Sequence, residues 1–205
     1  MDLSVIFLGT GGSVPSARRS TAAVLVARGG ERLLFDCGEG TQRQMQRSLG
    51  LTQVDEIYLT HFHADHILGL PGLLKTYSLR GRDSGLTLYG PRGTEALIAS
   101  LRRVFGALTY PFDIVELAPR DRVPVEDGAY HAFRVEHGVE AYGYALVEDD
   151  RPGRFDVETA DRLGVEPRAR GALQRGETVT LADGTSVAPG DVLGESRRGR
   201  RIVLT

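Results

Sequence analysis

The sequence predicts an α/β protein, an α+β sandwich in which two β-sheets pack together and helices flank them. Three observations lead to this prediction. Short apolar runs with strand spacing recur along the first 150 residues, segments with helical spacing lie between them, and glycine-rich turns separate the two. Such strands and helices form layers, because each element buries one apolar face against a neighbouring layer.

Eight segments have the composition and spacing of β-strands. They are Leu3–Leu8, Thr21–Ala27, Arg32–Asp36, Glu56–Thr60, Leu86–Tyr89, Asp113–Leu117, Tyr130–Glu136 and Tyr142–Val147. In Tyr130–Glu136 apolar and polar residues alternate, which indicates a strand with one solvent-facing side. Residues 178–187 surround an Asp-Gly pair and predict a β-hairpin.

Four segments have the spacing of helices: Thr41–Leu49, Pro71–Leu79, Thr94–Phe105 and Val157–Leu163. Pro71 would lie in the first turn of its helix, where its missing N–H is not needed. In the third helix, Leu97, Leu101 and Val104 mark an apolar stripe.

Composition is that of a soluble globular protein, with 41% hydrophobic and 25% charged residues in a 205-residue chain. No stretch approaches the length of a transmembrane helix. The one cysteine, Cys37, excludes an internal disulfide and suits a cytoplasmic protein, and we expect it to be buried. The net charge of −2 gives no overall attraction to nucleic acid, although all but one of the 25 basic residues are arginines.

The most informative segment is His61-Phe62-His63-Ala64-Asp65-His66, which directly follows a predicted strand. His61 and His63 lie two residues apart, so an extended chain places both side chains on one side, where they can bind the same metal. Asp65 and His66 follow where the chain turns and would point toward a second metal. Nitrogen and carboxylate ligands suit zinc or another divalent ion.

The hexapeptide is the signature of the metallo-β-lactamase superfamily, and the longer run from Leu59 to Leu74 resembles its ribonuclease Z branch. The Gly-Leu-Pro-Gly-Leu sequence at residues 69–73 distinguishes this branch from the lactamases, glyoxalases and lactonases. Further matches occur, in the family's order, at residues 7–11, 35–42, 89–91 and 136–144.

The resemblance implies a metallo-β-lactamase-like αββα fold and a zinc-dependent endoribonuclease that removes the 3′ trailer from precursor tRNA. It implies two zinc ions, one held by His61, His63 and His137, the other by Asp65 and His66. Asp65 would also be catalytic, accepting a proton from the attacking water. Family members are usually homodimers, and precursor tRNA would be the partner, with no membrane involved.

The resemblance also implies a division of the chain. Residues 1–148 would form the first half of the core, residues 149–194 a protruding tRNA-binding arm (the exosite), and residues 195–205 the start of the second half. Within the arm, the expected phosphate contacts are Arg162, Arg168, Arg170 and Arg175. The family's Gly-Pro dipeptide is absent from this arm.

The sequence stops at Thr205, where the family continues with Gly-Asp-Thr and the aspartate that bridges both metals. We therefore expect a fragment that lacks the C-terminal portion of the fold, has an incomplete second zinc site and is inactive alone.

Two alternatives stay open. A general phosphodiesterase or arylsulfatase-like hydrolase would share the hexapeptide but would not need the arm. An inert fragment or partner subunit would bind little metal. Deletion of the arm tests the first alternative, and metal content tests the second.

Overall fold

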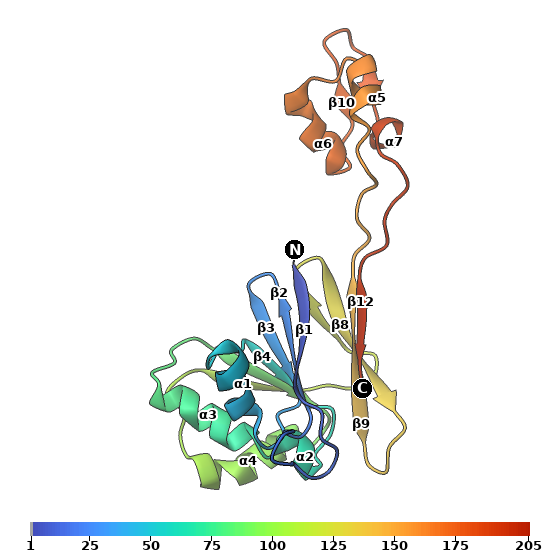
Figure 1. Ribbon diagram of the computed structural model, residues 1–205. Coiled ribbons are helices and arrows are strands. Elements are labelled where there is room, and N and C mark those ends of the chain that lie inside the picture. The colour runs from blue at the N-terminus through green and yellow to red at the C-terminus, as the bar shows by residue number, and fades with distance from the viewer. Residues whose placement is uncertain (1) are drawn as a thin grey trace. The chain divides into compact units, whose positions relative to one another are not determined.

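The computed structural model describes residues 2–205 (Figure 1). Its contacts divide the chain into two compact units. The first contains residues up to Arg122, residues 131–145 and residues 203–205, and the second contains residues 123–130 and 146–202. All of the predicted metal ligands lie in the first unit, and all four predicted arm arginines lie in the second.

The first unit is built on a six-stranded sheet with strands in chain order. The strands are β1 (Leu3–Gly9), β2 (Ala23–Arg28), β3 (Glu31–Phe35), β4 (Glu56–Tyr58), β5 (Leu86–Gly90) and β6 (Phe112–Glu116). Strands β1 to β3 pair antiparallel, whereas β3 to β6 pair parallel. The carboxyl ends of the parallel strands therefore meet at one edge of the sheet, which is where ligand sites form in such sheets.

Helices cover one face of this sheet, as Figure 1 shows. They are α1 (Thr41–Leu49), the single turn α2 (Ala64–Ile67), α3 (Leu70–Leu79) and α4 (Thr94–Phe105). Met45, Leu73 and Ile98 from these helices pack with Leu34 and Ile57 of the sheet in one buried cluster. Burial of this cluster, at roughly 1.5–3 kcal/mol per large apolar side chain, fixes the helices on the sheet.

One detail of the predicted stripe on α4 is wrong. Leu97 and Leu101 are half-buried, but Val104 is 75% exposed, and the buried residues are Ile98 and Phe105. The helix therefore turns a slightly different face to the sheet than its apolar spacing indicated.

The second sheet has the order β12-β9-β8-β7, with β7 (Arg122–Val125), β8 (Gly128–Val135), β9 (Ala141–Glu148) and β12 (Arg201–Leu204). Strands β8 and β9 run through both units. Within the first unit, Tyr144 of β9 packs against Phe35 and Tyr58 at ring-centroid distances of 5.8 and 5.1 Å. Phe35 follows Leu34 in an alternating strand, so the first sheet buries both of its faces.

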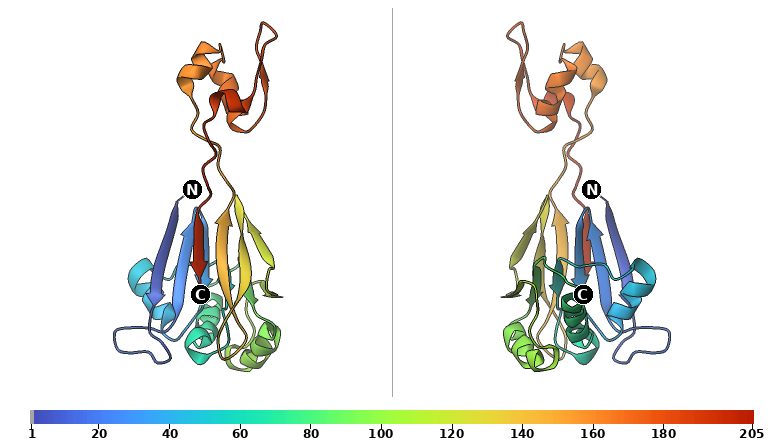
Figure 2. Two further views of the ribbon diagram at one scale, coloured as in Figure 1. Left: turned by 90° about the vertical axis from the view of Figure 1, so that its right-hand side faces the viewer. Right: turned by 90° about the vertical axis from the view of Figure 1, so that its left-hand side faces the viewer.

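In the second unit, two extended segments form a stalk, defined here as residues 149–154 and 194–200. Arg151 and Arg197 exchange backbone hydrogen bonds of 2.8 and 2.9 Å across it, and Figure 2 shows the two segments side by side. A Cβ on Gly153 would lie 1.9 Å from the Gly194 carbonyl oxygen, so only glycine permits this close approach.

The stalk leads to a small globular end, residues 155–193. It contains α5 (Val157–Arg162), the 3₁₀ turn η1 (Pro167–Ala169), α6 (Arg170–Gln174), β10 (Val179–Thr180), β11 (Ser186–Val187) and α7 (Pro189–Val192). These elements pack around their own cluster of buried apolar residues, namely Ala160, Val165, Leu173, Val187 and Val192. The predicted hairpin is confirmed by the pairing of β10 with β11.

All eight predicted strands and all four predicted helices are present, with ends shifted by no more than two residues. The elements that sequence reasoning missed are short: β7, α2, η1, α6 and α7. Cys37 is fully buried, as expected. Within residues 2–205, no helix is both long and apolar enough to cross a membrane.

Candidate metal centre

Three histidines from two parts of the chain converge in the first unit. The Nε2 atom of His61 lies 3.1 Å from Nδ1 of His63, and Nε2 of His137 lies 3.2 Å from the same atom. Nitrogen ligands at 2.0–2.1 Å from a tetrahedral zinc lie about 3.3 Å apart. The spacing and the donor chemistry of the three side chains therefore fit one zinc ion.

His61 has the electrostatics of a metal ligand. Burial, together with the neighbouring imidazoles of His66, His137 and His63, lowers the pKa of His61 to about 4. At neutral pH this ring is uncharged, and only an uncharged imidazole nitrogen can bind a metal.

The position of His137 depends on the next strand. His137 follows β8, and the chain returns as β9, where Tyr142 N donates to the Thr60 carbonyl at 2.9 Å. The Tyr144 hydroxyl donates to the Leu59 carbonyl at 2.6 Å. These two bonds hold β9 against the segment that leads into the hexapeptide, and the hairpin thereby delivers His137 to the other histidines.

Asp65 and His66 lie on α2 beside this cluster. The ring centroids of His61 and His66 are 4.1 Å apart, and His66 Nε2 lies 3.6 Å from Asp65 Oδ2. Ser13 N donates to Asp65 Oδ2 at 2.8 Å. Burial acts to raise the pKa of Asp65, but the Ser13 hydrogen bond and the neighbouring histidines outweigh it and lower that pKa, so the carboxylate stays ionised.

Asp36 is the site residue that sequence reasoning missed. Its carboxylate accepts hydrogen bonds from Thr60 N at 2.8 Å and from His66 Nδ1 at 2.7 Å. Because a carboxylate only accepts, this bond assigns the proton to Nδ1 and leaves Nε2 of His66 free to bind a metal. Burial acts to lower the pKa of His66, but the bond to Asp36 outweighs it and raises that pKa.

The backbone around Asp36 is shaped for this role. Asp36 has a φ of 57°, and the following turn packs directly on the α2 segment through a bond of 2.8 Å from Cys37 N to the His66 carbonyl. A Cβ on Gly38 would lie 2.1 Å from the Asp65 carbonyl oxygen. A signal for Asp36 was present in the sequence, because it lies in the run of residues 35–42 that resembles the family.

The arm arginines are all bonded within the second unit. Arg168 pairs with Glu166, Arg175 Nε lies 2.8 Å from Glu177 Oε1, and Arg170 pairs with Asp161. Arg162 donates to the Thr159 hydroxyl at 2.8 Å. The structure thus places them together on the globular end, but with partners of their own.

Comparison with known proteins extends these findings. The ribonuclease Z of Myxococcus xanthus is 47% identical over 206 residues, which cover 99% of this chain and 67% of that protein. The chain belongs to the ribonuclease Z family. The resemblance read from the motifs is thereby confirmed. The chain spans about two thirds of the length of the curated relatives that it matches.

Two solved structures support the assignment of the family and of the fold. Human tRNase Z, short form, is 35% identical, with a TM-score of 0.63 over 70% of this chain and 63% of that one. The metallo-β-lactamase fold protein YhfI of Bacillus subtilis, at 22% identity, shares the fold with a TM-score of 0.58 over 70% of this chain and 57% of that one. The predicted metallo-β-lactamase-like fold is confirmed.

Residues 3–151 also belong, by their match, to the family described as Anti-Pycsar protein Apyc1. This match ends at residue 151, within the first segment of the stalk. The alignment with the Myxococcus xanthus ribonuclease Z covers 99% of the chain, so it continues through the globular end.

Proposed function

We propose that this protein is a zinc-dependent endoribonuclease that removes the 3′ trailer from precursor tRNA. The observation that carries the proposal is the identity to ribonucleases Z, which spans the metal centre and the arm together. A histidine cluster alone would support only a metal-dependent hydrolase.

In this proposal His61, His63 and His137 hold one zinc ion, and Asp65 and His66 contribute to a second. Zinc bound there would supply Lewis acidity, which makes water more acidic and neutralises charge on a phosphate. Asp36 holds His66 in the orientation and tautomer that a ligand requires.

Asp65 is the residue that we propose as proton acceptor. Its carboxylate is ionised, lies beside His66 and is held by the Ser13 amide, so it can receive a proton from a water that attacks the scissile phosphate. This role rests on the family resemblance and on the position of Asp65.

The arm, residues 149–194 of the predicted division, would bind the tRNA away from the cleaved bond. A large substrate gains binding energy from such remote contacts, whereas a small phosphodiester does not. We also propose a cytoplasmic homodimer, because the buried free cysteine suits a reducing compartment and family members are usually dimers.

The experiment that tests the function uses a chain that continues past Thr205 through the family's Gly-Asp-Thr sequence, because the chain ending at Thr205 is expected to be inactive. In that protein, residues 155–193 are replaced with a short Gly-Ser linker. The cut ends lie close together, because Phe155 and Leu193 form a β-bridge. We expect cleavage of precursor tRNA to fall at least about 100-fold, while hydrolysis of bis(p-nitrophenyl) phosphate is retained. An equal loss of both activities would show that the arm serves stability and not substrate binding.

The second candidate is a phosphodiesterase that acts on small substrates. The match of residues 3–151 to the Anti-Pycsar family favours it, because that match does not include the globular end. For such an enzyme the linker variant would keep its preferred activity, and precursor tRNA would be a poor substrate even before the replacement.

A further inference from the structure

The second unit separates its charges between the stalk and the globular end. The globular end, residues 155–193, has four arginines and seven carboxylates, a net charge of −3. The stalk, residues 149–154 and 194–200, has five arginines and three carboxylates, a net charge of +2. A phosphate backbone is attracted to unpaired cations, so the two regions differ in what they offer to RNA.

The arginines of the globular end are the weaker candidates. Arg168, Arg170 and Arg175 each pair with a nearby carboxylate. The exposed pairs of Arg168 and Arg175 contribute only about 0–1 kcal/mol, so pairing alone would not keep these two arginines from RNA. The excess of carboxylates is the stronger argument, because its field repels phosphates at close range.

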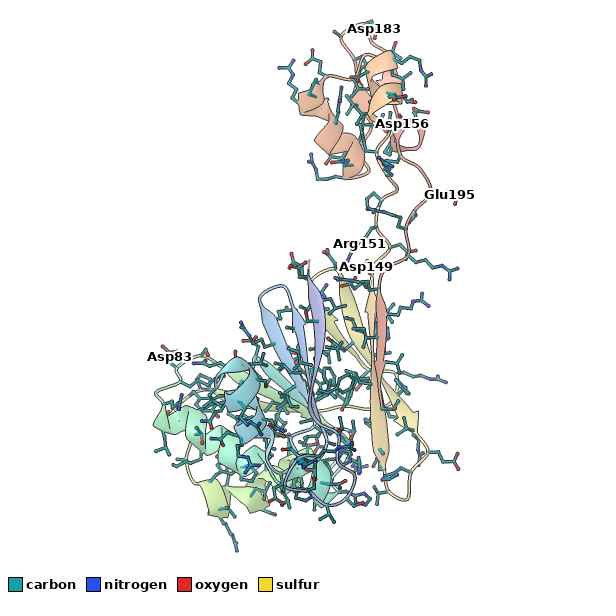
Figure 3. The ribbon with its side chains drawn as sticks, in the orientation of Figure 1. Asp83, Asp149, Arg151, Asp156, Asp183 and Glu195 are labelled. Carbon is teal, nitrogen blue, oxygen red and sulfur yellow. The ribbon has the colours of Figure 1, made fainter. Side chains whose placement is uncertain are left out.

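Two of those carboxylates, Asp156 and Asp183, are stabilised in the charged form. A hydrogen bond from Thr159 N lowers the pKa of Asp156, and one from Thr185 N lowers the pKa of Asp183. Figure 3 labels both aspartates on the globular end. Near neutral pH these two aspartates therefore keep their negative charge.

The stalk arginines fall into two groups. Arg151 and Arg200 bind the buried carboxylate of Glu148, at 2.8 and 2.6 Å, and so brace the base of the stalk. Arg154, Arg197 and Arg198 are exposed and have no ion-pair partner among residues 2–205. Only the Nε of Arg197 is engaged, donating to the Pro152 carbonyl at 3.3 Å, which leaves the rest of that guanidinium available.

The backbone of the stalk fixes these three residues in place. Gly194 N donates to the Arg154 carbonyl at 3.0 Å, and the backbones of Arg151 and Arg197 bond to each other. The two segments of the stalk are therefore hydrogen-bonded at both positions. Arg197 and Arg198 are neighbours in an extended chain, and their side chains therefore point to opposite faces. The ribbon therefore presents cations on both faces from a backbone that is already ordered before RNA binds.

We propose that Arg154, Arg197 and Arg198 form a phosphate-binding strip on the stalk. This strip supplies the electrostatic part of precursor-tRNA binding, and the globular end contributes contact by shape. The inference rests on the proposed function and replaces the arm arginines as phosphate contacts. It assigns a positioning role that reads no base sequence.

The test compares two triple variants that change the net charge equally. One carries Arg154→Gln, Arg197→Gln and Arg198→Gln; the matched control carries Arg162→Gln, Arg168→Gln and Arg175→Gln. Binding to a precursor tRNA transcript is measured from 50 to 200 mM salt, with EDTA present so that no cleavage follows. Circular dichroism of each variant checks that it is folded.

For the stalk variant we expect binding to weaken about 10- to 100-fold at low salt. The slope of log K against log salt should fall by roughly 1–2, because Arg197 and Arg198 point to opposite faces and one RNA strand meets one face. The control variant should keep the slope of the parent protein. A larger loss of tRNA affinity in the control variant, or no loss of affinity in either variant, would contradict the proposed phosphate-binding strip. Failure of the unmodified protein to bind precursor tRNA would instead contradict the proposed function, and this inference with it.

Discussion

At the scale of single residues, His63 is central because its Nδ1 atom lies within 3.2 Å of a nitrogen on each of the other two histidines. Asp36 lies outside the predicted ligand set. Its hydrogen bond to His66 Nδ1 determines which nitrogen of that ring is free. His63 therefore affects whether the metal binds, and Asp36 affects how well the ligand His66 is oriented.

We therefore expect His63→Ala to abolish tight zinc binding, because two histidines cannot replace a three-ligand site. Elemental analysis after dialysis against buffered zinc measures it. His131→Ala is the matched control, since His131 lies on β8 outside the cluster and its loss should leave the zinc content unchanged. Equal zinc content in both variants would contradict the ligand assignment.

Asp36→Asn should weaken metal affinity or activity about 10- to 100-fold, the usual effect of losing a carboxylate that orients a ligand histidine. A competition titration with a zinc chelator measures the affinity. Asp55→Asn serves as control, because Asp55 accepts a bond from Arg32 N next to the opposite end of β4. The assignment fails if both variants bind zinc as tightly as the parent protein.

At the scale of elements, the globular end behaves as a small module with its own core. Its cluster contains five buried apolar residues, and Leu173 is fully buried among them. Such a module has little stability in reserve, because few apolar contacts offset the ordering of its backbone.

Leu173→Ala should remove about 2–5 kcal/mol, enough to unfold the globular end locally. We expect limited proteolysis to cut this variant within residues 155–193 while the metal-binding unit stays intact. Leu163→Ala makes the same chemical change at a partly exposed position and should be cut no faster than the parent protein. Cleavage spread over the whole chain would mean that the globular end is not a separate module.

At the scale of the whole molecule, the metal centre and the arm belong to different compact units, and each has its own source of stability. A ligand stabilises only the folded state that binds it. Metal should therefore act on the unit with the histidines and leave the arm unaffected.

Zinc at about 100 times its dissociation constant would add roughly 2.7 kcal/mol to the metal-binding unit. For a unit of this size, that corresponds to a rise in its melting temperature of about 5–10 °C. Calorimetry with and without EDTA measures it, and the transition of the linker variant should shift by the same amount. A chelator-insensitive transition would show that no folded-state metal site exists.

The sequence by itself determined the strands, the long helices and the first ligands. These depend on local information: apolar spacing along one segment, or ligands that lie within six consecutive residues. The family resemblance added His137, which no local pattern singles out. Short elements such as α2 and α7 were missed because a single turn has too few residues to show a period.

Only the tertiary structure decided which distant residues meet. Asp36 reaches His66 across 30 positions and Ser13 reaches Asp65 across 52, because strand order and a close backbone approach at Gly38 bring those segments together. The same holds for the arm, where counting arginines could not tell paired cations from available ones. The sequence identifies the charged residues, but the fold determines which groups each of them contacts.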